Sequence, residues 1–235
     1  MARGGLKGRL YPEFARVSQA LASERRLELL DVLAQAPRRV EALADETGMT
    51  IANVSQHLQV LKNARLVESE RHGTSVTYRL ASPSVLRLWL ALTGVAEERL
   101  PEVARLRLEH RADDTELSRA NLARLLRRKD VVLVDVRPAV EFQHGHIPGA
   151  ISMPLPELPA RIDELPRDKR IVAYCRGTYC LMADDAVALL RERGFDAVKL
   201  DGGWPEWAAE HSFDEAAGTR RRPSGRRVRA GSRSG

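Results

Sequence analysis

Three short, largely apolar runs in the second half of the chain limit its fold more than any other feature. They are Val131–Val134, Ile171–Tyr174 and Ala197–Leu200. The continuous apolar character of Val131–Val134 is typical of a strand that is buried on both faces of a parallel sheet. Helical patterns separate the three runs, and this alternation predicts an α/β domain with helices on both faces of the sheet. Asp135 and Cys175 follow two of the runs, so both are expected at the carboxyl edge, where such sheets hold their sites.

Both cysteines of the chain lie in one hexapeptide, Cys175-Arg-Gly-Thr-Tyr-Cys180, between an apolar run and a helical pattern. A loop in this position aims backbone N–H groups at the first sulfur, which predicts a reactive thiolate at Cys175. Arg176 is expected to lower the pKa of Cys175 or to attract an anionic donor. Two cysteines do not make a disulfide scaffold. The expected active-site loop also contains Gly177, Thr178 and Tyr179.

The first half has the element order of a winged helix-turn-helix. Helical spacing predicts one helix from Ser23 to Ala36, a second that ends at Gly48, and a third from Thr50 to about Ala64. The following segment alternates apolar and polar residues around a Gly-containing turn, which predicts a β-hairpin. The first half is therefore expected to be a mostly α, α+β domain.

The third predicted helix has the features of a DNA-recognition helix. Val54, Leu58 and Leu61 form one apolar face, and the opposite face carries amides and hydroxyls. Such side chains suit base edges, whereas Lys and Arg suit phosphates. The residues predicted to contact double-stranded DNA are Thr50, Asn53, Ser55, Gln56, His57, Gln59, Lys62, Arg71 and Arg79.

Residues of about 15–110 resemble the ArsR family of bacterial repressors. The resemblance depends on Leu21-Ala-Ser-Glu-Arg-Arg26-Leu-Glu-Leu-Leu30, Val54-Ser-Gln-His-Leu58-Gln-Val-Leu61 and Tyr78-Arg79-Leu80. It implies a homodimer on a two-fold DNA operator. The helix that would form the dimer surface, or alternatively an internal core helix, carries Val85, Leu86, Trp89, Leu90 and Val95. Many members sense soft metals through cysteines, but this half has none, so no metal site is expected in it.

Residues of about 114–212 resemble rhodanese-like sulfurtransferases. The resemblance depends on Leu133-Val-Asp-Val-Arg137-Pro-Ala-Val-Glu141-Phe, Gly145-His-Ile-Pro-Gly149-Ala-Ile, Tyr174-Cys175-Arg-Gly and Leu200-Asp-Gly-Gly-Trp204-Pro-Glu-Trp207. It implies that Cys175 carries a covalent persulfide taken from a sulfane-sulfur donor such as thiosulfate or polysulfide. No other cofactor is expected. Asp135 and Arg137 are expected to pair and support the domain rather than to transfer protons.

The length of the cysteine loop separates two chemistries. Related phosphatases hold phosphate in a Cys-x5-Arg loop, but the sixth residue after Cys175 is Leu181, which disfavours phosphatase activity. Sulfurtransferase loops often place a cation at the fifth position, where this chain has Cys180. Sustained thiosulfate turnover is therefore in doubt, and whether the domain is an enzyme is open.

Three interpretations of Cys180 remain. It is an inert small residue, a resolving thiol that attacks a persulfide on Cys175, or half of a site for a thiophilic ion. Two thiolates are too few for a closed zinc site without further ligands.

The net charge of +6 is distributed unevenly. Residues 1–112 carry 17 basic and 13 acidic side chains, residues 113–218 carry 14 and 19, and residues 219–235 carry seven and none. We expect an N-terminal tail over 1–14, a linker over 111–114, the second domain over 115–212 and a basic disordered tail over 213–235. That tail either adds nonspecific attraction to nucleic acid or is only solvated.

No apolar run of ~18 residues predicts a membrane span, and no apolar signal core follows the N-terminus, so a cytoplasmic protein is expected. The leading hypothesis is a DNA-binding regulator, with the character of a repressor, whose second domain senses or transfers sulfane sulfur. The alternatives are an active sulfurtransferase carried on a DNA-binding dimer, and a constitutive repressor with a degenerate second domain.

Overall fold

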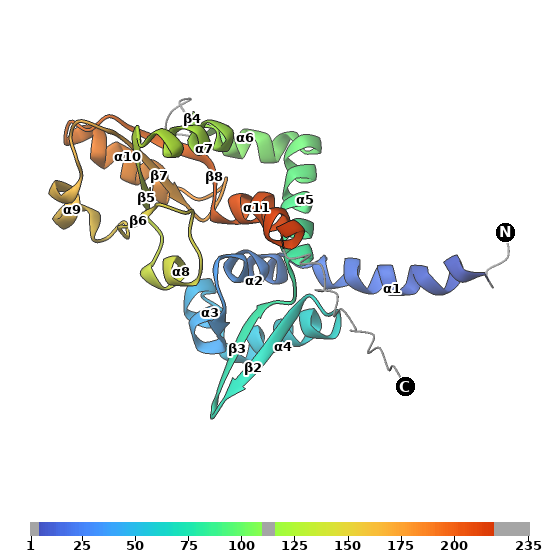
Figure 1. Cartoon of the computed structure of the whole chain (residues 1–235). Helices are drawn as coiled ribbons and strands as arrows, with labels where there is room; N and C mark the ends of the chain where they lie inside the picture. The colour runs from blue at the N-terminus through green and yellow to red at the C-terminus, as the bar shows by residue number, and fades with distance from the viewer. Residues whose placement is uncertain (1–4, 110–115, 219–235) are drawn as a thin grey trace, which may run out of the picture.

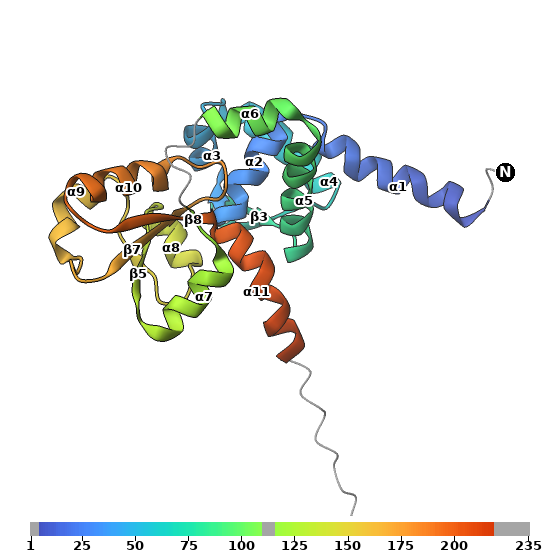
Figure 2. The ribbon, with the colours of Figure 1, turned by 90° about the horizontal axis from the view of Figure 1, so that it is seen from above.

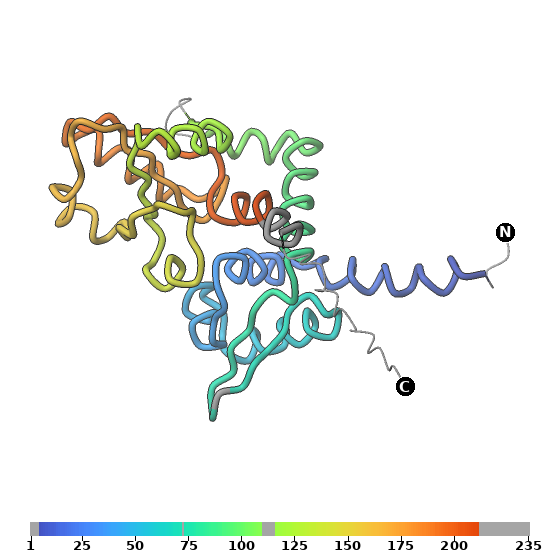
Figure 3. Tube along the Cα trace, in the orientation of Figure 1, coloured from blue at the N-terminus to red at the C-terminus, as the bar shows by residue number. Residues whose placement is uncertain are grey.

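The computed structural model describes residues 5–109 and 116–218, with side chains to residue 211 (Figures 1 and 3). The predicted linker over 111–114 and residues 219–235 of the predicted basic tail lie outside the described residues. The chain forms a winged-helix domain followed by an α/β domain.

The winged-helix domain contains six helices and a small antiparallel sheet in the described residues, with the strand order β1-β3-β2. Its elements are α1 (Leu6–Leu21), α2 (Glu24–Gln35), β1 (Arg38–Arg39), α3 (Val40–Thr47), α4 (Ile51–Asn63), β2 (Val67–His72), β3 (Ser75–Leu80), α5 (Pro83–Arg99) and α6 (Pro101–Glu109).

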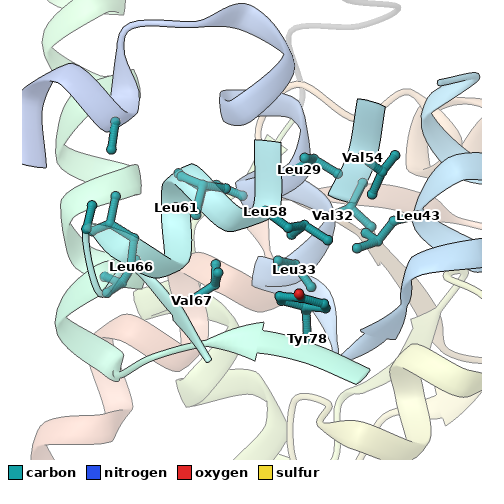
Figure 4. Packing of buried hydrophobic residues seen from close by; sticks show 14 of the residues in the cluster. Leu29, Val32, Leu33, Leu43, Val54, Leu58, Leu61, Leu66, Val67 and Tyr78 are labelled. Atoms are coloured by element: carbon teal, nitrogen blue, oxygen red, sulfur yellow. The ribbon is translucent and has the colours of Figure 1, made fainter. Parts of the chain in front are cut away.

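Local signals set the boundaries of these helices. The Thr50 side chain accepts a hydrogen bond of 3.2 Å from the backbone N–H of Asn53, and so caps α4. Gly48 follows α3 in the left-handed conformation, with φ of 66°. The apolar face of α4 packs with α2 and the hairpin (Figure 4), so that Leu29, Leu58 and Leu61 are completely buried. The predicted helix-turn-helix and hairpin are confirmed.

The N-terminal segment differs from the expected tail. Residues 6–14 are the first part of α1, which extends away from the rest of the molecule in both views of the ribbon (Figures 1 and 2). Tyr11 and Phe14 are 61% and 58% exposed. The segment is basic, but its apolar residues follow helical spacing.

The α/β domain is built on a five-stranded parallel sheet, with the strand order β4-β8-β7-β5-β6. Its elements are β4 (Glu116–Leu117), α7 (Arg119–Arg128), β5 (Val131–Asp135), α8 (Ala139–His144), β6 (Ile151–Ser152), α9 (Leu158–Arg161), a 3-10 turn (Ile162–Glu164), β7 (Arg170–Cys175), α10 (Met182–Glu192), β8 (Ala197–Gly203) and α11 (Trp204–Gly218). Because α11 continues to Gly218, the structured part extends past the expected boundary at residue 212.

The central strand β7 is buried on both faces, as its continuous apolar run predicts. Ile171, Ala173 and Cys175 pack into a core with α10, whereas Val172 and Tyr174 pack into a second core with α7 and α11. Cys175 is the last residue of β7. It therefore lies at the carboxyl edge of the sheet and on the face that α10 covers.

The two domains are packed together. Helix α11 packs against α5 and α2 of the winged-helix domain, as Figure 1 shows. This contact brings the carboxyl edge of the parallel sheet against the winged-helix domain. Among the described residues, no helix has both the length and the apolar character needed to cross a bilayer.

Candidate functional site: a cysteine loop between two domains

Cys175 lies beneath the loop and is completely buried. Its thiol is 3.3 Å from the backbone carbonyl of Cys180, to which it donates a hydrogen bond. Burial raises the pKa of Cys175 well above its ordinary value, and its interaction with the Cys180 side chain raises it further. The net shift is opposite to the lowering expected from Arg176, because the loss of hydration outweighs the stabilising backbone N–H groups.

Cys180 has the opposite character. It is half-buried, and both cysteines are reduced. A hydrogen bond from the Cys175 thiol lowers the pKa of Cys180 to about 7, against the opposing effect of burial. Backbone N–H groups of Arg176 and Met182 and the charge of Arg176 act in the same direction. Cys180 is therefore the thiol of the pair that ionises more easily.

Glu206 fastens the loop to the end of β8. Its carboxylate accepts hydrogen bonds from the backbone N–H of Gly203 at 2.8 Å, from the backbone N–H of Thr178 at 3.3 Å and from the Thr178 hydroxyl at 3.2 Å. A side chain on Gly203 would collide with the backbone of Cys175 and Gly177. The Gly-Gly-Trp-Pro-Glu motif therefore holds the cysteine loop, a role that the sequence did not assign to Glu206.

Asp135 and Arg137 form the predicted pair beneath the site. Both side chains are completely buried, with 2.7 Å between a guanidinium nitrogen and a carboxylate oxygen. Arg137 also donates to the backbone carbonyl of Gly145 at 2.7 Å. Its partners are inside the fold, so the pair supports the domain, as expected.

Arg176 belongs to a ring of four charges that joins the two domains. Arg38 contacts Glu46 and Glu141, each at 2.7 Å. Arg176 contacts Glu141 at 2.5 Å and Glu46 at 3.0 Å. Arg38 and Glu46 come from β1 and α3, whereas Glu141 comes from α8 of the α/β domain. Arg176 is thus paired with two carboxylates in the ring, a role that the sequence did not predict for it.

Gln35 is a second connection between the domains. This completely buried residue ends α2, and its amide donates a hydrogen bond of 2.8 Å to the backbone carbonyl of Arg176. Its amide oxygen accepts a longer contact of 3.4 Å from Arg137. The winged-helix domain therefore contacts both the cysteine loop and the pair beneath it.

A pocket of about 320 Å³ lies between the loop and the winged-helix domain. Asp31, Trp89, Leu90 and Thr93 line it from α2 and α5, and residues 176–180, Pro205 and Glu206 line it from the other side. The Trp89 indole donates a hydrogen bond of 3.3 Å to Asp31. The carboxyl of Asp31 lies at the pocket wall, and its partial loss of hydration raises its pKa to about 6, against the lowering effects of Trp89 and Arg176. No local sequence signal predicts that these residues from distant parts of the chain line one pocket.

The residues predicted to bind DNA surround α4 and the hairpin, away from the parallel sheet in Figure 1. Asn53, Ser55, Gln56 and Gln59 are exposed, and His57 is half-buried. Thr50 serves as the helix cap described above.

Three cations extend this surface onto the wing. Lys62 donates to Ser69 at 2.7 Å, Arg79 pairs with Glu68 at 2.6 Å, and Arg71 donates to the carbonyl of Gly73 at 3.0 Å. These partners hold the exposed cations near the hairpin.

The helix expected to form the dimer surface, α5, buries Val85 but exposes an apolar row of Leu88, Leu92 and Val95. Val85 belongs to the winged-helix core, and Trp89 and Leu90 line the pocket beside the cysteines. Leu86 lines another pocket against the α/β domain, whereas Val95 is exposed. Packing against the second domain accounts for this difference. No group of three or more His, Cys, Asp or Glu side chains is arranged for a metal ion in the part of the chain that the structure describes.

Two family models match the chain. Residues 23–69 match the ArsR family of bacterial regulatory proteins, and residues 118–210 match the rhodanese-like domain. The cysteine loop and the ring residue Glu141 lie within the second match.

One known protein resembles most of the chain, and others resemble only one of its two domains. The HTH-type transcriptional regulator Rv0324 of Mycobacterium tuberculosis is 47% identical over 86% of this chain and 89% of its own length. A sulfurtransferase of Allochromatium vinosum is 38% identical over 36% of this chain and 78% of its own length. A homodimeric winged helix-turn-helix domain from Mycobacterium bovis is 45% identical, with a TM-score of 0.40, and covers 43% of this chain and 93% of that chain. The chain therefore belongs to the family of HTH-type transcriptional regulators and joins an ArsR-type helix-turn-helix to a rhodanese-like domain.

Proposed function

We propose that this regulator is a repressor whose affinity for its DNA operator changes when the cysteine loop takes up sulfane sulfur. The observation that carries the proposal is the docking of that loop on the winged-helix domain. Gln35 binds the loop carbonyl, and Arg176 joins the ring that includes Arg38 and Glu46. We therefore expect a change in the loop to alter the contacts that these residues of the DNA-binding domain make.

The ring of charges connects the cysteine loop to the hairpin of the winged-helix domain through a series of contacts. Arg38 and Arg39 form β1, which pairs with Tyr78 and Thr77 of β3. Glu46 lies in α3, which packs against α4. Displacement of Arg176 would take one cation from both Glu46 and Glu141 and leave Arg38 as their remaining partner in the ring, which would alter the support of α3 and β1. Regulation requires that the modified loop favours one arrangement of these elements over the other.

The persulfide is proposed to rest on Cys175. In the transfer step a cysteine thiolate attacks the terminal sulfur of a sulfane donor R–S–SH, the donor S–S bond breaks, and R–S⁻ leaves. The product is Cys–S–SH, and no oxidant is needed. Attack by Cys180 on the inner sulfur of that persulfide would form a disulfide and release HS⁻. An added sulfur on the completely buried Cys175 has no free space, so the loop must move to accept it.

A homodimer is part of the proposal. Exposed apolar side chains on α1 and at the end of α5 supply the surface for it, among them Leu6, Tyr11, Phe14 and Val95. A two-fold pair of winged helices would place two copies of α4 on one operator.

Operator binding of the full-length protein before and after treatment with polysulfide tests the proposal. We expect wild type to change its affinity at least tenfold, and Cys175→Ser to respond much less. Mass spectrometry of the peptide with both cysteines identifies the modification. Equal responses of wild type and Cys175→Ser would show that Cys175 is not the sensing residue. Continuous turnover of thiosulfate by the DNA-bound protein would instead support a sulfurtransferase carried on DNA.

A further inference from the structure

The pocket between the domains is the opening that leads to the cysteine pair. Cys180 is among the residues that line it, together with Arg176, Gly177, Thr178 and Tyr179 of the loop. Cys175 is completely buried and does not line it. A molecule that enters the pocket therefore meets Cys180 first. A volume of about 320 Å³ suits a small organic molecule.

The charges around the pocket do not suit an anion. The described residues that line it include two acids, Asp31 and Glu206, and one base, Arg176. Arg176 is neutralised by the ring, which contains two arginines and two glutamates. The hydrogen-bond donors to Glu206 are neutral groups, and the nearby cation Arg119 is paired with Glu210 and Asp201. The two acids therefore give the pocket an excess of negative charge.

Asp31 is the acid that the winged-helix domain contributes. Its hydrogen-bond partner Trp89 is neutral. The charged groups that act on it are Arg176 of the loop, Glu206 of α11 and Glu141 of α8, so acids outnumber bases around it.

We propose that this pocket binds the sulfur donor, that Cys180 receives the sulfur, and that the donor is an organic sulfane compound without negative charge. This inference rests on the sulfur-dependent function proposed above and names the substrate class of the same site. It assigns the first step to the accessible thiol and leaves Cys175 as the buried carrier.

The chemistry balances without another reactant. The Cys180 thiolate attacks the terminal sulfur of R–S–SH, so that Cys180–S–SH forms and R–S⁻ leaves. Water protonates R–S⁻ to give R–SH, and the hydroxide that remains takes the thiol proton of Cys175 once the loop has opened. The Cys175 thiolate then attacks the outer sulfur of Cys180–S–SH. This step forms Cys175–S–SH and restores the Cys180 thiolate.

Charged thiol reagents measure the charge preference directly. Full-length protein is treated with the cationic aminoethyl, neutral methyl or anionic sulfonatoethyl methanethiosulfonate, and the modification of Cys180 is followed by peptide mass spectrometry. Rates are divided by those of a free thiol. We expect the anionic reagent to be slowest, and Asp31→Asn to increase its rate about three- to tenfold while the neutral reagent changes little. Glu24→Gln, a change of an exposed acid on the same helix, is the matched control.

Falling pH provides a second readout in the same experiment. The ratio of the anionic to the neutral rate should rise in wild type as pH falls through about 6, where Asp31 takes up a proton. Both reagents react with the same Cys180 thiolate, so the ratio of their rates does not depend on the ionisation of Cys180. In Asp31→Asn this ratio should not change with pH. A ratio of one in wild type, or no effect of Asp31→Asn, would overturn the charge preference.

Sulfur donors then separate this inference from the function on which it rests. An alkyl hydropersulfide, whose protonated form R–S–SH is the uncharged electrophile, and thiosulfate are compared at mildly acidic pH, with wild type and Cys180→Ser. We expect faster labelling from the hydropersulfide, and labelling of Cys175 that is at least tenfold slower in Cys180→Ser. Equal labelling by both donors, or an undiminished rate in Cys180→Ser, would overturn the inference but leave sulfur sensing intact. Labelling by neither donor would overturn the sensing function itself.

Discussion

Gln35 donates a hydrogen bond of 2.8 Å to the backbone carbonyl of Arg176 and so joins the last residue of α2 to the cysteine loop. The two residues are 141 positions apart in the chain. Because of this buried contact, we expect a change in the conformation of the loop to alter the position of α2 in the DNA-binding domain. The contact also identifies a residue whose removal should separate sulfur uptake from DNA binding.

Gln35→Ala should leave the loop carbonyl without its partner. An unsatisfied buried acceptor costs about 1–3 kcal/mol of stability, which urea unfolding would measure. We also expect Cys175 to take up sulfur while operator affinity, followed by fluorescence anisotropy, no longer responds to it. Gln143→Ala, a change on the exposed side of α8, should leave both properties as in wild type. A normal response in Gln35→Ala would place the coupling elsewhere.

Arg38→Met should destabilise the protein by about 3 kcal/mol, because it removes one partner of the completely buried Glu141. The double variant Arg38→Met with Glu141→Leu removes both charges of that contact. It should lose less stability than the sum of the two single variants, as measured by urea unfolding. Strict additivity would mean that the two side chains do not interact in solution.

Alkylation of Cys180 by iodoacetamide should accelerate as pH rises through about 7, since the thiolate is the reacting form. Cys175→Ala removes the hydrogen bond that contributes most to the lowered pKa of Cys180. The midpoint of the rate profile should therefore move to higher pH in this variant. Cys175 in Cys180→Ala should stay slow at every pH below 9, because burial raises its pKa. An unchanged Cys180 profile in Cys175→Ala would contradict the hydrogen bond.

Tyr11→Glu with Phe14→Glu should weaken self-association, because both side chains are exposed apolar groups on α1. A charge placed in an apolar interface must be desolvated without a partner. Sedimentation equilibrium should show the dimer dissociating at a concentration at least tenfold higher than for wild type. Lys7→Glu changes charge on the same helix without removing an apolar group, and serves as the control. Equal dissociation of both variants would place the interface away from these residues.

Much of the fold follows from neighbouring residues. The cap of α4 by Thr50 involves Asn53, three positions along the chain, and the buried pair involves Asp135 and Arg137, two positions apart. Apolar periodicity and four ordered motifs were sufficient to predict both domains. They failed at residues 6–14, where a helix stands in place of the expected tail.

The character of the site depended on the packing of the two domains. Sequence placed Cys175 and Cys180 in one loop, but their opposite pKa shifts arise from how deeply each sulfur is buried and from the contact between them. Likewise, the sequence places a cation at Arg176, but only the structure shows that it pairs with Glu141 of α8 and Glu46 of α3. Local patterns are fixed by interactions over a few residues, so the sequence by itself determined the elements, the two families and the reactive loop. Burial and electrostatic fields sum over residues distant in the chain, so only the tertiary structure decided which thiol is accessible and which charges face it.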